Sequence, residues 1–326
     1  MSTILTRRQF TSAAAAIGLS ASVPAVWSMQ EQISRLRRIR AVTIGAPDLA
    51  GVESLYVEWL GYSVVERGTV ASKLAQSWGA PASAGRRFIS MRPASGAEVD
   101  IRAVEIDEVA GYRPLTTLGW NAIELIVDDV YKLFETIRKG PYEILGEPHS
   151  LGGNIASIHA MQLIGPAREV VYLTAETGDR KASTLPEPGS FVDRPFIMVL
   201  AGMDMAALES CYTGKLNMPR GGSWNMPVWS ISRAQGLPIE TKFNLTLLRC
   251  AEKGNGIELD EYPPGATPRP RAEGQLPPGV AMTSFTVGRL AEVDLPFIQP
   301  PAALYGEVRA ATFTGPAGEL TELIEG

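Results

Sequence analysis

Two glutamates on apolar segments have the residue type and the surroundings that acid–base chemistry needs. Glu322 lies in the segment ELTELIE, where alternation with a period of two places it on one face with Leu320 and Ile324. Glu258 lies in the apolar segment GIELDEY. Burial raises the pKa of a carboxyl group, so an enclosed glutamate becomes a general acid or base near neutral pH. The alternatives are a half-exposed strand near the chain end for Glu322 and a generally acidic strand end for Glu258.

Two tryptophans indicate what kind of molecule the protein would bind. Trp224 and Trp229 lie in and just after Gly221–Val228, a stretch rich in Gly, Pro and Met that we expect to be a loop. In a loop these side chains would form an apolar lid or wall, and the ligand would be a hydrophobic, aromatic small molecule. Packing in the core is the alternative.

Histidine and cysteine offer little for metal or thiol chemistry. His149 and His159 are the two histidines of the chain, and we interpret both as surface or core residues. Cys211 and Cys250 have no nearby histidine to act as a base, so we expect two buried free thiols and no cysteine nucleophile. A disulfide is the alternative if the protein is exported.

Composition narrows the class of partner. A chain of 326 residues is long enough for two domains, and 45% hydrophobic with 20% charged residues describes a globular protein. The net charge of −5 argues against nucleic acid or an anionic membrane surface as the main partner. The sequence has no phosphate-binding glycine loop and no GxSxG motif.

Residues 1–28 have the features of an export signal. The segment TRRQF (6–10) resembles a twin-arginine signal, and an Ala-rich apolar stretch too short to span a bilayer follows it. We expect cleavage near Ser28, or at Ser22. The twin-arginine export machinery would then be a partner, and the mature protein would be periplasmic or otherwise exported, without a stable membrane span. A cytoplasmic protein with an unrelated arginine pair is the alternative.

An internal repeat organises the rest of the chain. At an offset of 156 residues, Asp48, Leu55, Tyr56 and Leu60 correspond to Asp204, Cys211, Tyr212 and Leu216. At an offset of 150, GPAREVVYL (165–173) corresponds to GPAGELTEL (315–323). The second half of the chain therefore duplicates the first.

Each half divides again into two strand–helix–strand–strand–strand modules. The four modules span about 38–107, 117–177, 193–263 and 277–326. Each opens with an alternating apolar strand, and in three of them an aspartate follows as a helix N-cap: Asp48, Asp129 and Asp204. These patterns predict an α+β fold. We expect a first domain over 38–177, a linker over 181–190 and a second domain over 193–326, with the Pro-rich segment 263–278 as a surface loop.

The four module openings read RAVTIGAPDL (40–49), NAIELIVDDV (121–130), FIMVLAGMDM (196–205) and AMTSFTVGRL (281–290). They resemble the vicinal oxygen chelate superfamily of glyoxalase, bleomycin-resistance and extradiol-dioxygenase-like proteins, in its two-domain form. The resemblance implies paired modules whose curved sheets form a substrate cup. Family members carry a metal-ligating His seven residues before the helix-opening Asp, and here those positions are apolar: Ala41, Ala122, Ile197 and Met282.

The resemblance also implies which residues line the cups. The family's strand-four glutamates map to Asp100, Tyr172, Glu258 and Glu322. Met282 would contact the ligand, and Tyr172 would donate a hydrogen bond to a substrate oxygen or pack in the core. Glu124 lies on the same strand face as Ala122 and is a further candidate base, with a salt bridge as its alternative. Arg102 follows Asp100 on one face and would pair with it or bind an anion.

Three functions follow from these residues. The first is a metal-independent lyase or isomerase, without cofactor, that acts on a hydrophobic small molecule through Glu322, Glu258, Glu124 and Tyr172. The second is a protein that binds or sequesters such a molecule without chemistry. The third is a metal-dependent dioxygenase or glyoxalase with displaced ligands. A homodimer is left open, because this fold commonly pairs modules across chains.

Overall fold

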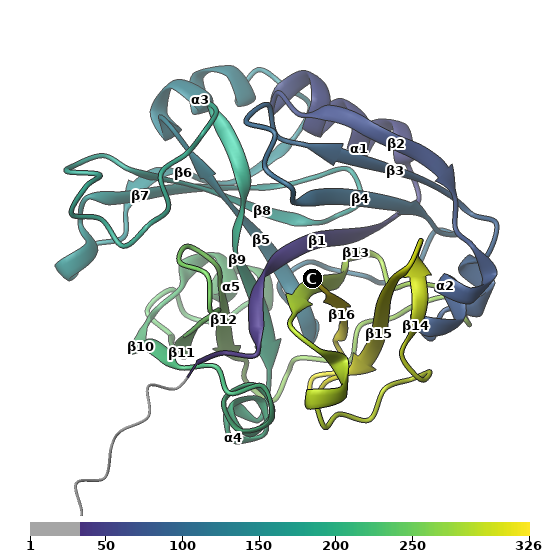
Figure 1. Cartoon of the computed structure of the whole chain (residues 1–326). Coiled ribbons are helices and arrows are strands. Elements are labelled where there is room, and N and C mark those ends of the chain that lie inside the picture. Colours follow the sequence, from purple (N-terminus) through teal and green to yellow (C-terminus); the bar gives the residue numbers. More distant parts are fainter. Residues whose placement is uncertain (1–32) are drawn as a thin grey trace, which may run out of the picture. The chain divides into compact units, whose positions relative to one another are not determined.

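The computed structural model describes residues 33–326, which form two eight-stranded sheets (Figure 1). The first module contains β1 (Leu36–Ala46), β2 (Ser63–Thr69), β3 (Arg87–Arg92) and β4 (Asp100–Glu105). The second contains β5 (Gly119–Val127), β6 (Glu143–Ser150), β7 (Ile158–Ile164) and β8 (Val170–Glu176). The third contains β9 (Val192–Gly202), β10 (Arg220–Pro227), β11 (Lys242–Arg249) and β12 (Gly256–Glu261). The fourth contains β13 (Gly279–Val287), β14 (Ala302–Tyr305), β15 (Val308–Thr314) and β16 (Leu320–Glu325).

Short helices follow the first strands of the modules. They are α1 (Leu49–Ser54) with η1 (Leu55–Trp59), α3 (Val130–Ile137), α4 (Met205–Glu209) with η4 (Ser210–Lys215), and the single turn η5 (Leu290–Glu292). The remaining helices are α2 (Ser72–Ser77), η2 (Pro81–Ser83), η3 (Gly153–Ile155) and α5 (Trp229–Gln235). The predicted α+β modules are confirmed, and residues 1–28 lie outside the part that the structure describes.

Aspartate caps begin three of the helices, as the sequence predicts. The Asp48 carboxylate accepts from the backbone N–H of Gly51, and Asp204 accepts from Ala207. Asp129 accepts from two backbone N–H groups at the start of α3. In the fourth module Arg289 occupies the cap position without a side-chain bond, and only one turn of helix forms. Among the helices that follow the first strands, a carboxylate that accepts from free N–H groups thus accompanies each one longer than a single turn.

Each sheet takes one module from each half of the chain. The order β14-β15-β16-β13-β1-β4-β3-β2 joins the fourth module to the first, and β10-β11-β12-β9-β5-β8-β7-β6 joins the third to the second. Antiparallel pairs hold the joins together, including Ala41 with Ser284 and Ala122 with Val199. The division of the chain into domains at 38–177 and 193–326 stays a prediction that is based on the repeat. Each sheet contains strands from both of these ranges.

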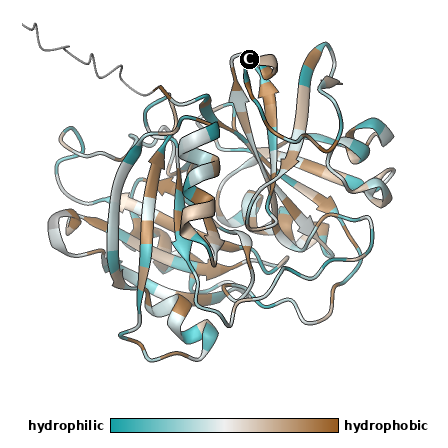
Figure 2. Ribbon diagram, turned by 90° about the horizontal axis from the view of Figure 1, so that it is seen from below, coloured by the Kyte–Doolittle hydropathy of each residue, from teal (hydrophilic) through white to brown (hydrophobic). Residues whose placement is uncertain are grey.

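Both sheets curl, and each has a face that we call a cup (Figure 1). Cup one is the face of the β1–β13 sheet that carries Thr43, Arg102 and Glu322. Cup two is the face of the β5–β9 sheet that carries Tyr172 and Glu258. Figure 2 shows many hydrophobic residues on the strands, and separate apolar clusters line the two cups. Among the described residues, no helix is long and apolar enough to cross a membrane.

One predicted loop is a strand. Gly221–Val228 falls almost entirely within β10, which pairs with β11 as an edge strand. The reason is visible in the alternation of Trp224 and Met226 with the exposed Ser223 and Asn225, a period of two. Trp229 instead begins α5, a helix inserted between β10 and β11, and the lid stays a prediction.

Candidate functional site

Strand register defines the equivalent positions of the four modules. In the first module Ala41 pairs with Asp100, and two residues further Thr43 pairs with Arg102. In the fourth module Ser284 pairs with Glu322 in the same way, two residues beyond Met282. The equivalent of Glu322 is therefore Arg102. By the same register, Tyr172 occupies the equivalent position in the second module and Glu258 in the third.

The assignment of Asp100 to this set is therefore corrected by two residues. The chain runs six residues from Gly96 to Arg102 but four from Gly318 to Glu322, and both glycines have left-handed φ angles, 76° and 79°. The two extra residues after Gly96 place Arg102, and not Asp100, at the position equivalent to Glu322. Asp100 instead pairs with Arg40 at 2.7 Å and with Arg92 at 2.5 Å, near the surface.

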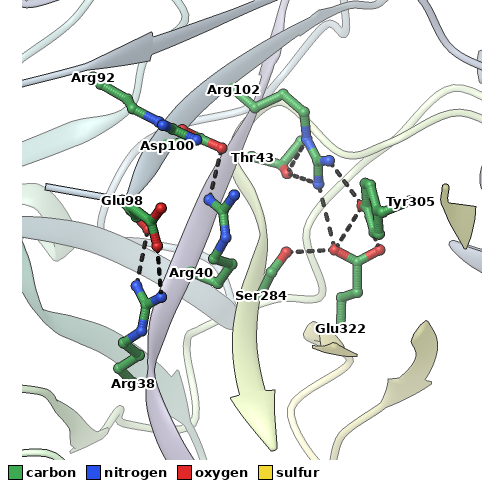
Figure 3. A network of polar contacts seen from close by, with 10 residues as sticks. All are labelled: Arg38, Arg40, Thr43, Arg92, Glu98, Asp100, Arg102, Ser284, Tyr305 and Glu322. Carbon is green, nitrogen blue, oxygen red and sulfur yellow. Dashed lines mark hydrogen bonds and ion pairs between the residues drawn. The ribbon is translucent and has the colours of Figure 1, made fainter. Parts of the chain in front are cut away.

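Cup one holds Glu322 with every carboxylate oxygen engaged (Figure 3). The Trp78 indole N–H donates to Oε1 at 2.9 Å, and the Ser284 hydroxyl donates to Oε2 at 2.6 Å. The Tyr305 hydroxyl lies 2.8 Å from Oε1 and 3.0 Å from Oε2. The Glu322 side chain is fully buried. Donor groups from Trp78, Ser284 and Tyr305 therefore surround this carboxylate within the protein.

The cation that balances this charge is Arg102. Its Nη2 lies 3.5 Å from the Glu322 carboxylate, and its Nε and Nη2 donate to the Thr43 hydroxyl at 3.0 and 2.8 Å (Figure 3). The guanidinium carbon lies 4.7 Å from the centre of the Trp78 ring, which covers it by a cation–π contact. From the sequence we expected Asp100 as an ion-pair partner of Arg102, whereas in the structure that partner is Glu322.

The rest of cup one is packed. Met282, expected to contact a ligand, is fully buried against Trp78 and Leu320 in an apolar cluster under α2. Tyr305, Trp78 and Ser284 were not predicted from the sequence. The only sequence signal for Ser284 is its position two residues after Met282. Both residues lie on β13, the strand on which Ser284 pairs with Glu322.

Neither cup has a donor set that fits the divalent metal implied by the fold. In cup one, a cation placed against Glu322 would face the Arg102 guanidinium. Ala41 supplies no ligand atom, and the soft thioether of Met282 is a poor ligand for a hard divalent ion. Among residues 33–326, no group of three or more His, Cys, Asp or Glu side chains is arranged to hold a metal ion. His159 bonds instead to Tyr131, at 2.6 Å.

Cup two gathers three carboxyl groups from two strands. The sequence assigns Glu124 to the first half of the chain and Glu258 to the second, and the pairing of β5 with β9 and of β9 with β12 brings them together. Burial raises the pKa of Glu124 to about 8, and the neighbouring Glu258 adds to the effect. Burial also raises the pKa of Glu258 to about 7.

Asp260 completes the cluster and was not selected from the sequence. It lies on the same strand face as Glu258 and shares a hydrogen bond with that carboxyl group. Burial first, and then the charges of Glu258 and Glu124, hold the pKa of Asp260 well above its usual range. Its Oδ1 is buried without a hydrogen-bond partner in the described structure. Burial and crowding, without a paired cation in the described part of the chain, therefore favour the protonated forms of these carboxyl groups.

Tyr172 lies beside these acids. Its pKa is raised by burial and then by Asp260, and its hydroxyl bonds to Ser230 of α5. Glu124 accepts from the Thr174 hydroxyl at 2.5 Å. Both Tyr172 and Glu258 keep some exposed surface. Glu124 and Glu258, the predicted acids of the second and third modules, thus lie in one site. Glu322 lies in the other cup.

The two tryptophans flank cup two. Trp224 packs on the cluster formed by Ile231, Phe243 and Leu245. Trp229 lines a hollow of about 500 Å³ between β6 and α5, together with Ile144, Leu145, Gly146, Glu147, His149 and Arg233. Leu145 also packs in the cluster that contains Tyr172. Trp224 is thus half-buried against an apolar cluster, Trp229 lines the hollow, and their role toward a ligand stays a prediction.

Comparisons with known proteins agree with this architecture. No protein-family model matches the sequence, and no curated protein matches it. Among solved structures, glyoxalase I from Zea mays is similar with a TM-score of 0.61 and 17% identity, over 88% of this chain and 92% of that one. A protein from Bacillus subtilis described as a candidate dioxygenase has a TM-score of 0.58 and 12% identity, over 90% of this chain and 86% of that one. At these identities the likeness concerns the fold, and the chain has the two-domain, four-module vicinal oxygen chelate fold.

Proposed function

We propose that the protein is a metal-independent enzyme, a lyase or isomerase, that moves a proton on a hydrophobic small molecule in cup two. The observation that carries the proposal is the cluster of Glu124, Glu258 and Asp260. Burial raises the pKa of Glu124 to about 8 and that of Glu258 to about 7, and it holds the pKa of Asp260 well above its usual range. A general base works best when its pKa lies near the working pH. Tyr172 supplies a neutral donor next to the cluster.

In the proposed reaction the Glu258 carboxylate removes a proton from the carbon next to a substrate carbonyl. The electron pair of that C–H bond moves onto the carbonyl oxygen, which accepts hydrogen bonds from Tyr172 and from protonated Asp260. Return of the proton to a different carbon gives an isomer. Loss of a leaving group from the neighbouring carbon, with the same electron pair, gives a lyase product. Glu124, with its higher pKa, holds the proton that keeps the cluster from carrying two charges.

Deuterium exchange tests this proposal without knowledge of the natural substrate. The protein is incubated in D₂O with a panel of apolar ketones, esters and lactones, and deuterium at carbon is measured by mass spectrometry. We expect enzyme-dependent exchange with at least one compound and its loss in Glu258→Gln. The exposed Glu307→Gln variant is the matched control and should keep full exchange. Full exchange in Glu258→Gln would overturn the assignment of the base.

A second function, binding or sequestration without chemistry, is favoured by the way α5 covers cup two. The side chain of Gln235 donates to the Leu115 carbonyl at 3.0 Å, and Arg113 donates to the Ala234 carbonyl at 2.9 Å, so the helix is fastened at its C-terminal end. Such a cover suits slow release of a ligand. Stoichiometric binding, with the ligand recovered unchanged after long incubation, would distinguish this function from catalysis.

We also propose that the protein works outside the inner membrane, after export that depends on residues 1–28. The proposal rests on the arginine pair Arg7–Arg8 and the Ala-rich stretch behind it. Replacement of both arginines by lysine in the full chain should leave the protein in the cytoplasm. Equal amounts of exported protein from both forms, measured by cell fractionation, would contradict a twin-arginine route.

A further inference from the structure

The hollow between β6 and α5 has the features of a binding site at the mouth of cup two. Its floor is Gly146, and its walls are Ile144, Leu145 and Trp229. A side chain at Gly146 would not fit, because its Cβ would lie 2.4 Å from the Trp229 ring and 2.3 Å from Gln162 Oε1. The glycine therefore lets the indole and the amide approach the strand closely.

Gln162 is a second and independent sign of a ligand. It is 6% exposed, and its Oε1 is buried without a hydrogen-bond partner among residues 33–326. It lies against the floor of the hollow at Gly146, and in the sheet it is the direct neighbour of Tyr172. An unpaired buried amide oxygen is costly, and a ligand donor or a water on the inner side of the hollow would satisfy it.

The outer rim of the hollow carries one cation, Arg233, and one acid, Glu147. The exposed Arg233 lies with its guanidinium carbon 5.2 Å from the Trp229 ring centre and has no carboxylate partner in the described part of the chain. Glu147 is the one acid that lines the hollow, and it also lines a neighbouring hollow with Arg138 and Lys139. Arg138 is itself paired with Glu135, at 3.1 Å.

We infer that this hollow binds a flat, apolar acid: an aromatic ring system with one carboxylate. The ring would lie among Trp229, Ile144 and Leu145, and the carboxylate would pair with Arg233. The anionic group stays at the rim, because the acids of cup two repel a second negative charge. The opposite, uncharged end of the molecule then points toward Gln162 and Tyr172. This inference rests on the proposed function for its orientation, and it names the substrate class of that site.

The test compares two probes of the same shape. Binding of 2-naphthoate and of the neutral 2-naphthylmethanol is measured by calorimetry and by the NMR signal of the Trp229 indole N–H. We expect saturable binding of the acid, at least about tenfold weaker binding of the alcohol, and a loss of about tenfold for the acid in Arg233→Gln. The exposed Arg271→Gln is the matched control and should bind as the wild type does. Glu147→Gln should tighten acid binding, because it removes a like charge.

A third variant tests the floor. Gly146→Ala should displace Trp229 and abolish binding, whereas Gly214→Ala, where the added Cβ meets nothing within 4 Å, should leave it unchanged. Equal affinity for the acid and the alcohol, or unchanged binding in Arg233→Gln, would overturn the inference. So would the absence of any shift of the Trp229 signal with benzoate, 2-naphthoate and 2-anthroate.

Different results would contradict the inference and the proposed function. Glu258→Gln should still bind 2-naphthoate at the rim, because that variant leaves Arg233 and Trp229 intact. If Glu258→Gln loses deuterium exchange while Arg233→Gln binds normally, the acid–base function stands and the ligand class falls. If Arg233→Gln loses binding while Glu258→Gln keeps exchange, the reverse holds.

Discussion

Arg102 and Glu322 form a buried ion pair between equivalent positions of two modules. The Arg102 Nη2 and Glu322 Oε2 atoms are 3.5 Å apart, and the side chains are 9% and 0% exposed (Figure 3). Each residue lies on the last strand of its module, opposite Thr43 or Ser284 on the first strand. The first module thus supplies a fixed cation where its counterpart supplies an anion, and the charge of cup one is balanced within the protein.

Breaking this pair should destabilise the fold. Arg102→Met leaves Glu322 buried with its hydroxyl and indole donors but without a cation, and we expect the free energy of unfolding to fall by about 3–5 kcal/mol. The double variant Arg102→Met with Glu322→Leu should recover much of the loss, because it removes the uncompensated charge. Urea denaturation of the two single variants and the double variant measures this coupling.

The exposed pair Arg87–Glu105 is the matched control, with its Arg87 side chain 71% exposed. Arg87→Met should change the unfolding midpoint little, because solvent screens that pair. An Arg102→Met variant as stable as Arg87→Met would show that the buried pair contributes no net stability.

Replacing the cation by an acid should create dependence on a metal. Arg102→Glu places a second carboxylate opposite Glu322, and two buried carboxylates repel each other unless a divalent ion lies between them. We expect this variant to melt lower than the wild type and to recover part of the loss with Mn²⁺ or Ca²⁺. Thermal scans with and without each ion are the measurement. A comparable rise in the melting temperature of the wild type would contradict the view that Arg102 obstructs a cation in cup one.

Both cysteines should be unreactive in the folded protein. Cys211 and Cys250 are buried free thiols, and burial raises the pKa of Cys211 to about 11 and that of Cys250 further. Thiolate is the reactive form, so neither group has much of it at neutral pH. A colorimetric thiol reagent should report two thiols in denaturant and almost none without it. Fewer than two in denaturant without reductant would indicate a disulfide.

The repeat could be predicted because local chemistry repeats with it. In the two GPA turns, the Glu169 and Glu319 carboxylates fold back to accept from the backbone N–H of Ala167 and Ala317, each at 2.8 Å. The aspartate caps repeat for a similar reason. Such contacts join residues two or three positions apart, so the sequence pattern carries them directly.

The site could be predicted only in part, because it depends on contacts between distant modules. The offsets between the halves show which residues occupy equivalent positions, but they do not show which residues are neighbours in space. They therefore do not predict that Glu124 lies near Glu258 or that Arg102 pairs with Glu322. Those pairs follow from the order of strands in the sheets. Tyr305 lies on a short edge strand, and no sequence pattern singles it out as a partner of Glu322.

The carboxyl cluster of cup two should make stability fall as the pH rises. The pKa of Glu124 is about 8 in the folded protein against an ordinary value of 4.5. The folded state therefore holds its proton more tightly than the unfolded state. The resulting stabilisation is complete below about pH 4.5 and is lost progressively as the pH rises toward about 8. Glu258 acts in the same direction over a narrower range, because its pKa is about 7.

Glu124→Gln isolates one of these contributions. Glutamine keeps the shape of the protonated acid and does not titrate, so the variant should lose less stability than the wild type between pH 5 and pH 8. Each pKa unit corresponds to about 1.4 kcal/mol, and we expect a relative gain on the order of 2–4 kcal/mol at the upper pH. Urea denaturation at several pH values measures the two curves. The exposed Glu307→Gln variant should follow the wild-type curve, and a Glu124→Gln curve parallel to both would mean that Glu124 titrates as an ordinary, solvated acid.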